Sequence, residues 1–244
     1  MPKIYRNIEV TLDRADEILK ELLTEYHRSL RAKEVNDKTT QLIHDICEKL
    51  RSALDRTARR YWEIHIAPSL SEEDKAAALI YFPIAKDQSG LDSFLGRWRW
   101  KAVKSSHQPV YDFLLGLQPF KDNNNKWLDV LNDLAIQGKH IDLVPQKKTE
   151  AQRIVVERGS ASVSWDPSAV TFGGGPGVSV FIAGAPIDPR TQRIVPTPGV
   201  TERIETWVSF IIEGHNVNAA GFCKESCAGT RAIVSEMSER FDLS

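Results

Sequence analysis

The chain has 244 residues, a mass of 27.5 kDa and a formal net charge of −1. Charged residues make up 27% and hydrophobic residues 41%, which is the ordinary mixture of a globular protein and excludes collagen-like, low-complexity and wholly disordered classes. The near-zero net charge excludes a strongly basic nucleic-acid grip over the whole surface, although it leaves room for a local basic patch.

Membrane and secretory signals are missing from the sequence. It contains no run of about 18 apolar residues, so we expect no membrane-spanning helix and no membrane partner. Residues 1–7 lack the apolar core of a secretory signal. Three cysteines, Cys47, Cys223 and Cys227, are an odd and sparse set that favours a reducing compartment, and we expect a cytoplasmic protein. Since no second pair of Cys or His residues has metal-type spacing, we predict neither a metal nor a cofactor.

Composition changes along the chain near residue 150. Residues 1–150 hold 4 of the 14 glycines, with 24 basic and 23 acidic residues, whereas residues 151–244 hold the other 10 glycines with 8 basic and 10 acidic residues. The first part is helix-like and the second is rich in glycine and β-branched runs. We therefore predict an α+β protein: an N-terminal antiparallel helical bundle over residues 1–148, then a small antiparallel β-rich domain with a C-terminal helix over residues 149–244.

Apolar periodicity locates the helices. Apolar residues recur at three- and four-residue steps from Leu12 to Leu30 and from Leu42 to Trp62, which predicts two long helices, the second over about 37–66. The connection between them is short, so they should pack antiparallel. Trp127, Leu131 and Leu134 share a helical face and should be buried against the second long helix near Leu50 and Leu54. Further helices are expected over 71–79, 91–101, 110–117, 127–138 and 219–241.

Extended segments are expected mainly in the second part. Residues 81–84 should be extended because the residue before Pro83 avoids the helical region. Short apolar or alternating runs predict strands over 153–157, 161–165, 170–172, 178–182, 193–195 and 202–212.

The segment from Arg60 to His65 places an arginine and a histidine on one predicted helix with four residues between them. This spacing resembles the Arg-x4-6-His motif of HEPN ribonucleases, which are small helical bundles that often dimerise. The resemblance implies that Arg60 and His65 of two protomers meet and cleave RNA without a metal, so RNA and a second copy of the chain are the implied partners. Such chemistry is sensible, because a histidine can take the 2′-hydroxyl proton while an arginine holds the phosphate.

Lys139 and His140 form a second candidate pair, at the end of a predicted helix for which Gly138 is the expected cap. Two interpretations are open. The pair complements the dipole at the helix C-terminus, or it is functional, as a histidine-based acid or as a phosphate-facing pair.

Four segments in fixed order resemble a widespread group of uncharacterised bacterial proteins over residues 40–145. They are residues 50–55 (LRSALD), 82–84 (FPI), 118–120 (QPF) and 138–140 (GKH). The resemblance implies a shared fold organisation and marks Arg51, Asp55, Lys139 and His140 as positions of interest, with Arg51 and Asp55 as binding candidates. Arg51 and Asp55 lie four apart on one helix, so the alternative is an intrahelical ion pair worth about 0.3–0.5 kcal/mol.

Two functions of different classes follow from these observations. The first is a metal-independent, HEPN-like ribonuclease with Arg60 and His65, or Lys139 and His140, in its site. The alternative is a non-enzymatic binding or scaffold module that uses the surface between the helices and the β-rich part.

Overall fold

The computed structural model describes residues 5–32, 37–100, 107–140, 146–165, 167, 170–173, 179–212 and 214–243. The side chains of residues 29–32, 137–140, 146–152 and 205–209 lie outside that description. The chain divides into two compact units, of which unit 1 comprises Met1–Lys147 with Ile211–Ser244 and unit 2 comprises Lys148–Phe210. The α+β class is confirmed, with helices first, small antiparallel sheets next and a helix at the end.

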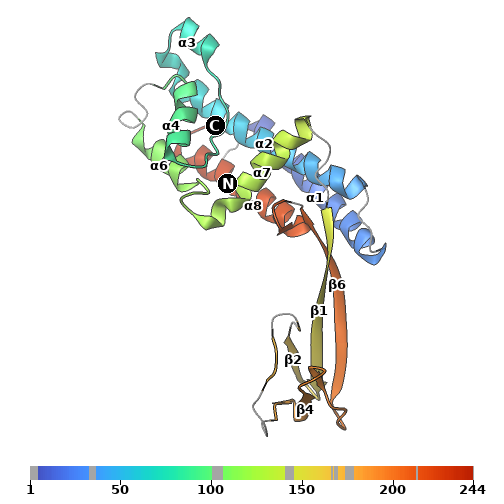
Figure 1. Ribbon diagram of the computed structural model, residues 1–244. Coiled ribbons are helices and arrows are strands. Elements are labelled where there is room, and N and C mark those ends of the chain that lie inside the picture. Colours follow the sequence, from blue (N-terminus) through green and yellow to red (C-terminus); the bar gives the residue numbers. More distant parts are fainter. Residues whose placement is uncertain are drawn as a thin grey trace. The chain divides into compact units, whose positions relative to one another are not determined.

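Unit 1 is a bundle of helices (Figure 1). Its long helix α2 (Asp37–His65) packs against the three other long helices, so the predicted pairing of the first two is confirmed. Those partners are α1 (Arg6–Ala32), α7 (Lys126–His140) and α8 (Ala219–Arg240). The shorter elements are the 3-10 turns η1 (Ala67–Ser69) and η2 (Asn123–Asn125) and the helices α3 (Glu72–Ala77), α4 (Gln88–Arg97) and α6 (Gln108–Gly116).

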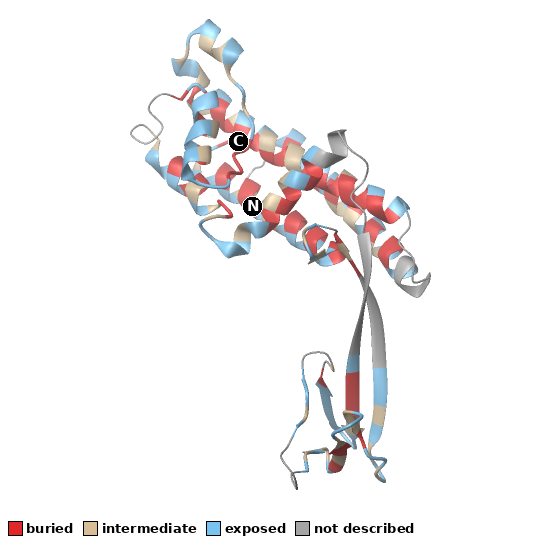
Figure 2. Ribbon diagram, in the orientation of Figure 1, coloured by how far each residue is buried: buried red, intermediate tan, exposed pale blue. Residues whose placement is uncertain are grey.

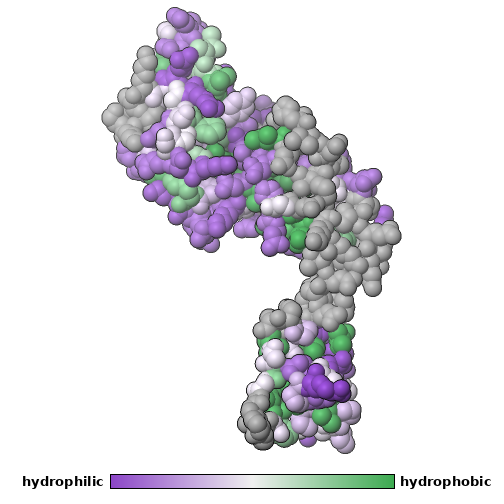
Figure 3. All heavy atoms as spheres, viewed as in Figure 1, coloured by the Kyte–Doolittle hydropathy of each residue, from purple (hydrophilic) through white to green (hydrophobic). Residues whose placement is uncertain are grey.

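The buried face of α2 explains why it lies at the centre of the bundle. Its buried residues recur at three- and four-residue steps, and in Figure 2 they follow the inner sides of the packed helices. Trp127, Leu131 and Leu134 on α7 are at most 8% exposed, which confirms their predicted burial. On the face shown in Figure 3, the described surface of this bundle is mostly hydrophilic, with hydrophobic residues in small separate groups.

Local hydrogen bonds set the ends of several helices. The Asn218 side chain caps α8 by accepting from the Gly221 N–H, as the Asp87 side chain does for α4 through Gly90. Helix α7 continues to His140, so the prediction that Gly138 ends it is wrong. After α8, Asp242 takes a positive φ of 46° and the Leu243 N–H reaches the Ser238 carbonyl, which closes the helix with Leu243 buried.

Unit 2 contains two small antiparallel sheets, except that the last strand of the first sheet, Val217–Asn218, belongs to unit 1. In the first, β1 pairs with β2 from Ile154↔Trp165 to Arg158↔Ala161 around a turn in which Gly159 has a φ of 59°. Its core joins Ile154 and Trp165 to apolar residues of the second sheet. The strands are β1 (Gln146–Arg158), β2 (Ala161–Trp165), β3 (Phe181–Ile182), β4 (Ala185–Asp188), β5 (Arg193–Ile194), β6 (Thr201–Ile212) and β7 (Val217–Asn218), with sheet orders β2-β1-β6-β7 and β3-β4-β5.

The strands differ from the sequence prediction in four places. Residues 170–172 are not a strand, and the strand expected over 178–182 covers only 181–182 among the described residues. Strands β4 and β7 were not predicted, because Pro186 and a two-residue pairing give no alternating pattern.

The division of the chain also differs from the predicted domains. We assigned residues 149–244 to one β-rich domain, but residues 211–244, which include α8, belong to unit 1. The physical reason is that α8 buries its apolar stripe against α1, α2 and α7. Among the described residues, no helix is long and apolar enough to cross a bilayer.

Candidate functional site

Arg51 and Asp55, in the middle of α2, hold the main chain of an extended segment. The Asp55 carboxylate accepts the Phe82 N–H at 2.8 Å, and the Arg51 guanidinium donates to the Phe82 carbonyl at 2.9 Å. The two side chains also form an ion pair at 3.1 Å. Because Phe82 is fully buried, its main-chain groups need protein partners, and this pair supplies both.

The same extended segment is held from its other side by Gln118. The buried Gln118 amide accepts the Ala85 N–H at 2.9 Å and donates to the Pro83 carbonyl at 3.0 Å. The segments containing LRSALD, FPI and QPF therefore meet in one structural unit. Its chemistry is main-chain hydrogen bonding, which explains these residue types without a ligand.

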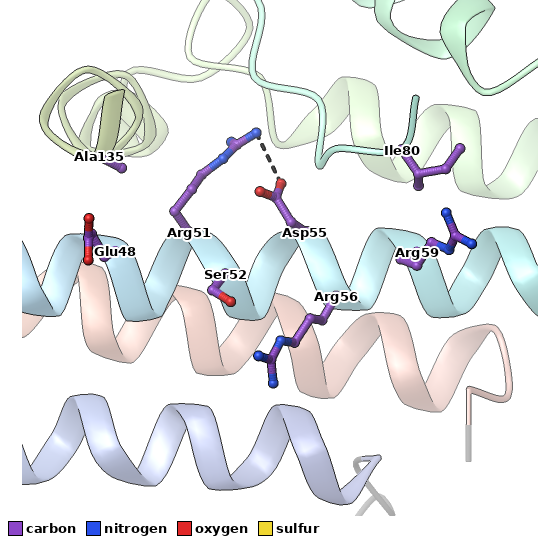
Figure 4. Close-up of a pocket in the computed structure, with 8 residues that line it drawn as sticks. All are labelled: Glu48, Arg51, Ser52, Asp55, Arg56, Arg59, Ile80 and Ala135. Carbon is purple, nitrogen blue, oxygen red and sulfur yellow. Dashed lines mark ion pairs between the residues drawn. The ribbon is translucent and has the colours of Figure 1, made fainter. Parts of the chain in front are cut away.

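A pocket of about 290 Å³ lies beside Arg51 and Asp55, between α2, α7 and the segment at Ile80 (Figure 4). Its arginines do not converge. Arg51 reaches toward Asp55, Arg56 points to the other side and binds Thr11 of α1 at 3.1 Å, and Arg59 pairs with Glu63 at 2.8 Å. A pocket with arginines directed apart is poorly suited to grip one anion.

One atom in this region remains unsatisfied. The Arg51 Nη1 is buried and has no hydrogen-bond partner, and burial lowers the pKa of Arg51 while the nearby Asp55 carboxylate raises it. The Arg51–Asp55 pair is thus a largely buried structural pair, held by its bonds to Phe82.

Lys139 and His140 are the last two residues of α7, and their side chains lie outside the described part of the structure. Ala135, one turn earlier on α7, lines the Arg51 pocket. The two interpretations of this pair stay predictions.

Arg60 and His65, near the end of α2, both bind main-chain carbonyls of the segment that follows α8. The Arg60 Nε lies 3.4 Å from the Leu243 carbonyl, and the His65 Nε2 lies 2.6 Å from the Phe241 carbonyl. The Arg60 guanidinium also stacks over the Tyr5 ring, 4.7 Å from its centroid. The fold therefore holds Arg60 in place. The hydrogen bond of His65 uses only Nε2, so Nδ1 is not part of it.

His65 lines a pocket of about 390 Å³, and a second histidine, His107, lines the same pocket. This His65–His107 pocket is lined by both imidazoles, Tyr61 and, at its rim, Arg240 and Asp242. Tyr61 lies between the histidines, with ring centroids 4.8 Å from His65 and 6.3 Å from His107. All these residues belong to unit 1, so one chain assembles the pocket.

Hydrogen bonds fix one nitrogen of each imidazole. The Phe241 carbonyl can only accept, so the His65 Nε2 carries a hydrogen and Nδ1 is the atom that gains or loses a proton. The His107 Nδ1 lies 3.1 Å from the Tyr61 hydroxyl, which can donate or accept. In the tautomer that carries its hydrogen on Nδ1, the ring donates to this hydroxyl and Nε2 is bare. Burial raises the pKa of Tyr61 and keeps its hydroxyl protonated at neutral pH.

The charge state of His107 is set by its surroundings. Burial lowers the pKa of His107, and the positive charge of protonated His65 lowers it further. His107 is consequently neutral near pH 7 and able to accept a proton. A pocket that holds one neutral imidazole next to a second one has the components of an acid–base pair.

Arg240 supplies a cation at the edge of this pocket. Its guanidinium lies over the Phe113 and Phe241 rings, at 5.3 and 5.7 Å from their centroids, and pairs with Glu236 at 2.8 Å. These contacts hold an exposed guanidinium near the imidazoles, where an anionic oxygen can bind it.

His107 and Arg240 were missed by the sequence analysis. His107 precedes α6 without any periodic or motif signal, and Arg240 is a basic residue in the last turn of α8, a common position that gives no signal of a site. The packing of the start of α6 and the end of α8 against the end of α2 brings them to His65. The three cysteines form no site by contrast, since all are buried and burial raises the pKa of each thiol. Across the described ranges no cluster of His, Cys, Asp and Glu could hold a metal.

Comparison with known protein families, with curated proteins and with solved structures gives no match.

Proposed function

We propose that this protein is a HEPN-like ribonuclease that cleaves RNA by acid–base catalysis in the His65–His107 pocket. The observation that supports it is the pairing of two imidazoles, each with one nitrogen held by the protein and the other able to exchange a proton. His65 is the histidine of the Arg-x4-6-His motif, and His107 joins it in place of the predicted partner from a second protomer.

The proposed reaction uses the two histidines in sequence. Neutral His107 takes the proton of an RNA 2′-hydroxyl on its Nε2, and the 2′-oxygen attacks the adjacent phosphorus. Protonated His65 donates from Nδ1 to the departing 5′-oxygen, so a 2′,3′-cyclic phosphate and a 5′-hydroxyl form. Arg240 binds the non-bridging phosphate oxygens, on which negative charge is concentrated. This histidine chemistry requires no metal.

The expected setting is the cytoplasm of a bacterium. Three free, buried thiols are stable in a reducing compartment, and RNA is available there. Since one chain provides both imidazoles, the proposed reaction does not depend on a dimer.

Incubation of the full chain with a short RNA that carries a fluorophore tests this proposal. We expect cleavage with a 2′,3′-cyclic phosphate product, and no cleavage of the DNA of the same sequence, which lacks the 2′-hydroxyl. His107→Gln and His65→Gln should each lower kcat by about 10²–10⁴-fold, because a glutamine amide cannot exchange a proton at neutral pH. His27→Gln, which changes an exposed histidine on α1, is the matched control and should leave kcat unchanged.

The pH dependence gives a second readout. A rate that needs neutral His107 and protonated His65 should pass through a maximum, and each variant should remove one limb of the curve. Equal cleavage of DNA, or activity retained in both variants, would overturn the proposal and favour the non-enzymatic binding module.

A further inference from the structure

A second pocket of unit 1, of about 400 Å³, lies where the starts of α7 and α8 meet. Trp127 of α7 and Phe222 of α8 form its floor, and Asn123 and Asn124 of η2 stand at its rim. The volume lies in the range of small-molecule sites, which combine apolar walls with a few polar groups. None of its residues belongs to the His65–His107 pocket.

The aromatic floor is held rigidly. Trp127 and Phe222 are 8% and 4% exposed, so each offers a small apolar area to the pocket. The Trp127 ring lies against Gly229, where a Cβ atom would come within 2.5 Å of the ring. This close approach fixes the ring between two helices, and a fixed aromatic surface suits a flat ligand at little cost in side-chain entropy.

The rim offers a mixture of hydrogen-bonding groups. Asn123 and Asn124 are exposed, and each carboxamide carries one acceptor oxygen and two donor hydrogens. Lys126 adds a cation and Glu225 an anion. The Asn218 amide is already engaged, since its oxygen accepts the Gly221 N–H and its nitrogen donates to the Tyr26 hydroxyl. A matching ligand needs a flat apolar body, an edge with donors and acceptors, and a negative group for Lys126.

We infer that this pocket binds a nucleotide through its base, with Asn123 and Asn124 at the base edge and Lys126 at the phosphate. Proteins recognise unpaired bases by contact with aromatic rings and by hydrogen bonds to the base edges, and a carboxamide can supply such hydrogen bonds. The inference goes beyond the proposed function and does not depend on it. Gly221 lines this pocket and Arg240 the other, and the two lie nineteen positions apart on α8, a rise of roughly 28 Å.

Titration of the full, ¹⁵N-labelled chain with adenosine 5′-monophosphate tests this site. The chain has six tryptophans, and we expect the indole resonance of Trp127 to shift saturably. Ribose 5-phosphate, which lacks the base, should cause no such shift. The double variant Asn123→Ala/Asn124→Ala should weaken binding about fivefold or more, as expected for the loss of one or two hydrogen bonds. Lys121→Ala, an exposed lysine of the same loop outside the pocket, is the matched control.

Competition then distinguishes the source of the base. Displacement of the nucleotide by a tetranucleotide RNA would indicate a base within RNA, and failure to displace it would indicate a free nucleotide; both results support base recognition. Equal binding of ribose 5-phosphate, unchanged affinity of the double asparagine variant, or loss of binding in His107→Gln would overturn the inference. Because the His107→Gln variant is expected to bind normally, failure here and failure of the ribonuclease proposal are separable.

Discussion

The sequence pointed to polar residues in two regions of α2, and these residues have different roles in the two regions. In the middle of α2, Arg51 and Asp55 give their hydrogen bonds to the main chain of Phe82. At the end of α2, the His65 Nε2 donates to the Phe241 carbonyl, while the ring also lines a pocket together with His107. A polar residue is available for chemistry when the fold uses only part of its hydrogen-bonding capacity. Substitutions in the first region should therefore change stability, and those in the second should change activity.

The largest effect on stability is expected from Asp55→Ala. It leaves the Phe82 N–H and the Arg51 guanidinium without their partner in a mostly buried place, which should cost about 2–4 kcal/mol in the free energy of unfolding. Glu63→Ala is the matched control, because Arg59–Glu63 is also an i,i+4 pair on α2 but is about half exposed. It should cost less than about 0.5 kcal/mol. Urea denaturation measures both, and equal losses would contradict the assignment of Asp55 to the core.

Gln118→Ala, at the other side of the extended segment, should lower the free energy of unfolding by a somewhat smaller amount. The change leaves the Ala85 N–H and the Pro83 carbonyl unpaired in the interior, at a cost of about 1–3 kcal/mol. Gln108→Ala, which removes an exposed amide that binds Asp112, should stay within about 0.5 kcal/mol of the wild type. Thermal melting compares the pair. If Gln118→Ala melted like the control, the extended segment would not depend on this amide.

The sequence predicted the helices better than the site, and the reason is physical. The buried stripe of α2 and the face of Trp127, Leu131 and Leu134 repeat with the period of a helix, so local pattern is enough to find them. The placement of α8 in unit 1 depends on contacts with helices that lie from about 90 to more than 200 residues earlier, which no local pattern encodes. His65 was found by its spacing from Arg60, but its partner His107 is brought in by tertiary folding alone.

The protein should become less stable at lower pH, in part because of His107 in the pocket at the end of α2. Burial lowers the pKa of His107, so the folded state takes up a proton less readily than the unfolded chain, whose histidines titrate near 6.5. Between that value and the lower folded-state pKa, the unfolded chain binds more protons, and stability falls as the pH falls. The buried His44, whose pKa burial also lowers, acts in the same direction. His107→Gln should flatten part of the slope between pH 7 and 5 in denaturation curves, and an unchanged slope would contradict the lowered pKa.

The smallest expected effect on stability, and the sharpest probe of the His65–His107 pocket, is Tyr61→Phe. The variant keeps the ring that packs against His65, Trp100 and Phe241 and removes only the hydroxyl bound to His107. Its cost should be about 1 kcal/mol, the value of one hydrogen bond. If Tyr61 is a positioning residue, neutral His107 loses the partner that holds the hydrogen on Nδ1, so ¹⁵N spectra of the imidazole should change from one tautomer to a mixture. Since only the tautomer with a bare Nε2 can act as the base, kcat should fall by about tenfold or less while KM changes little. A purely structural Tyr61 would lower stability by the same amount but leave the tautomer and kcat unchanged, which separates the two roles in one variant.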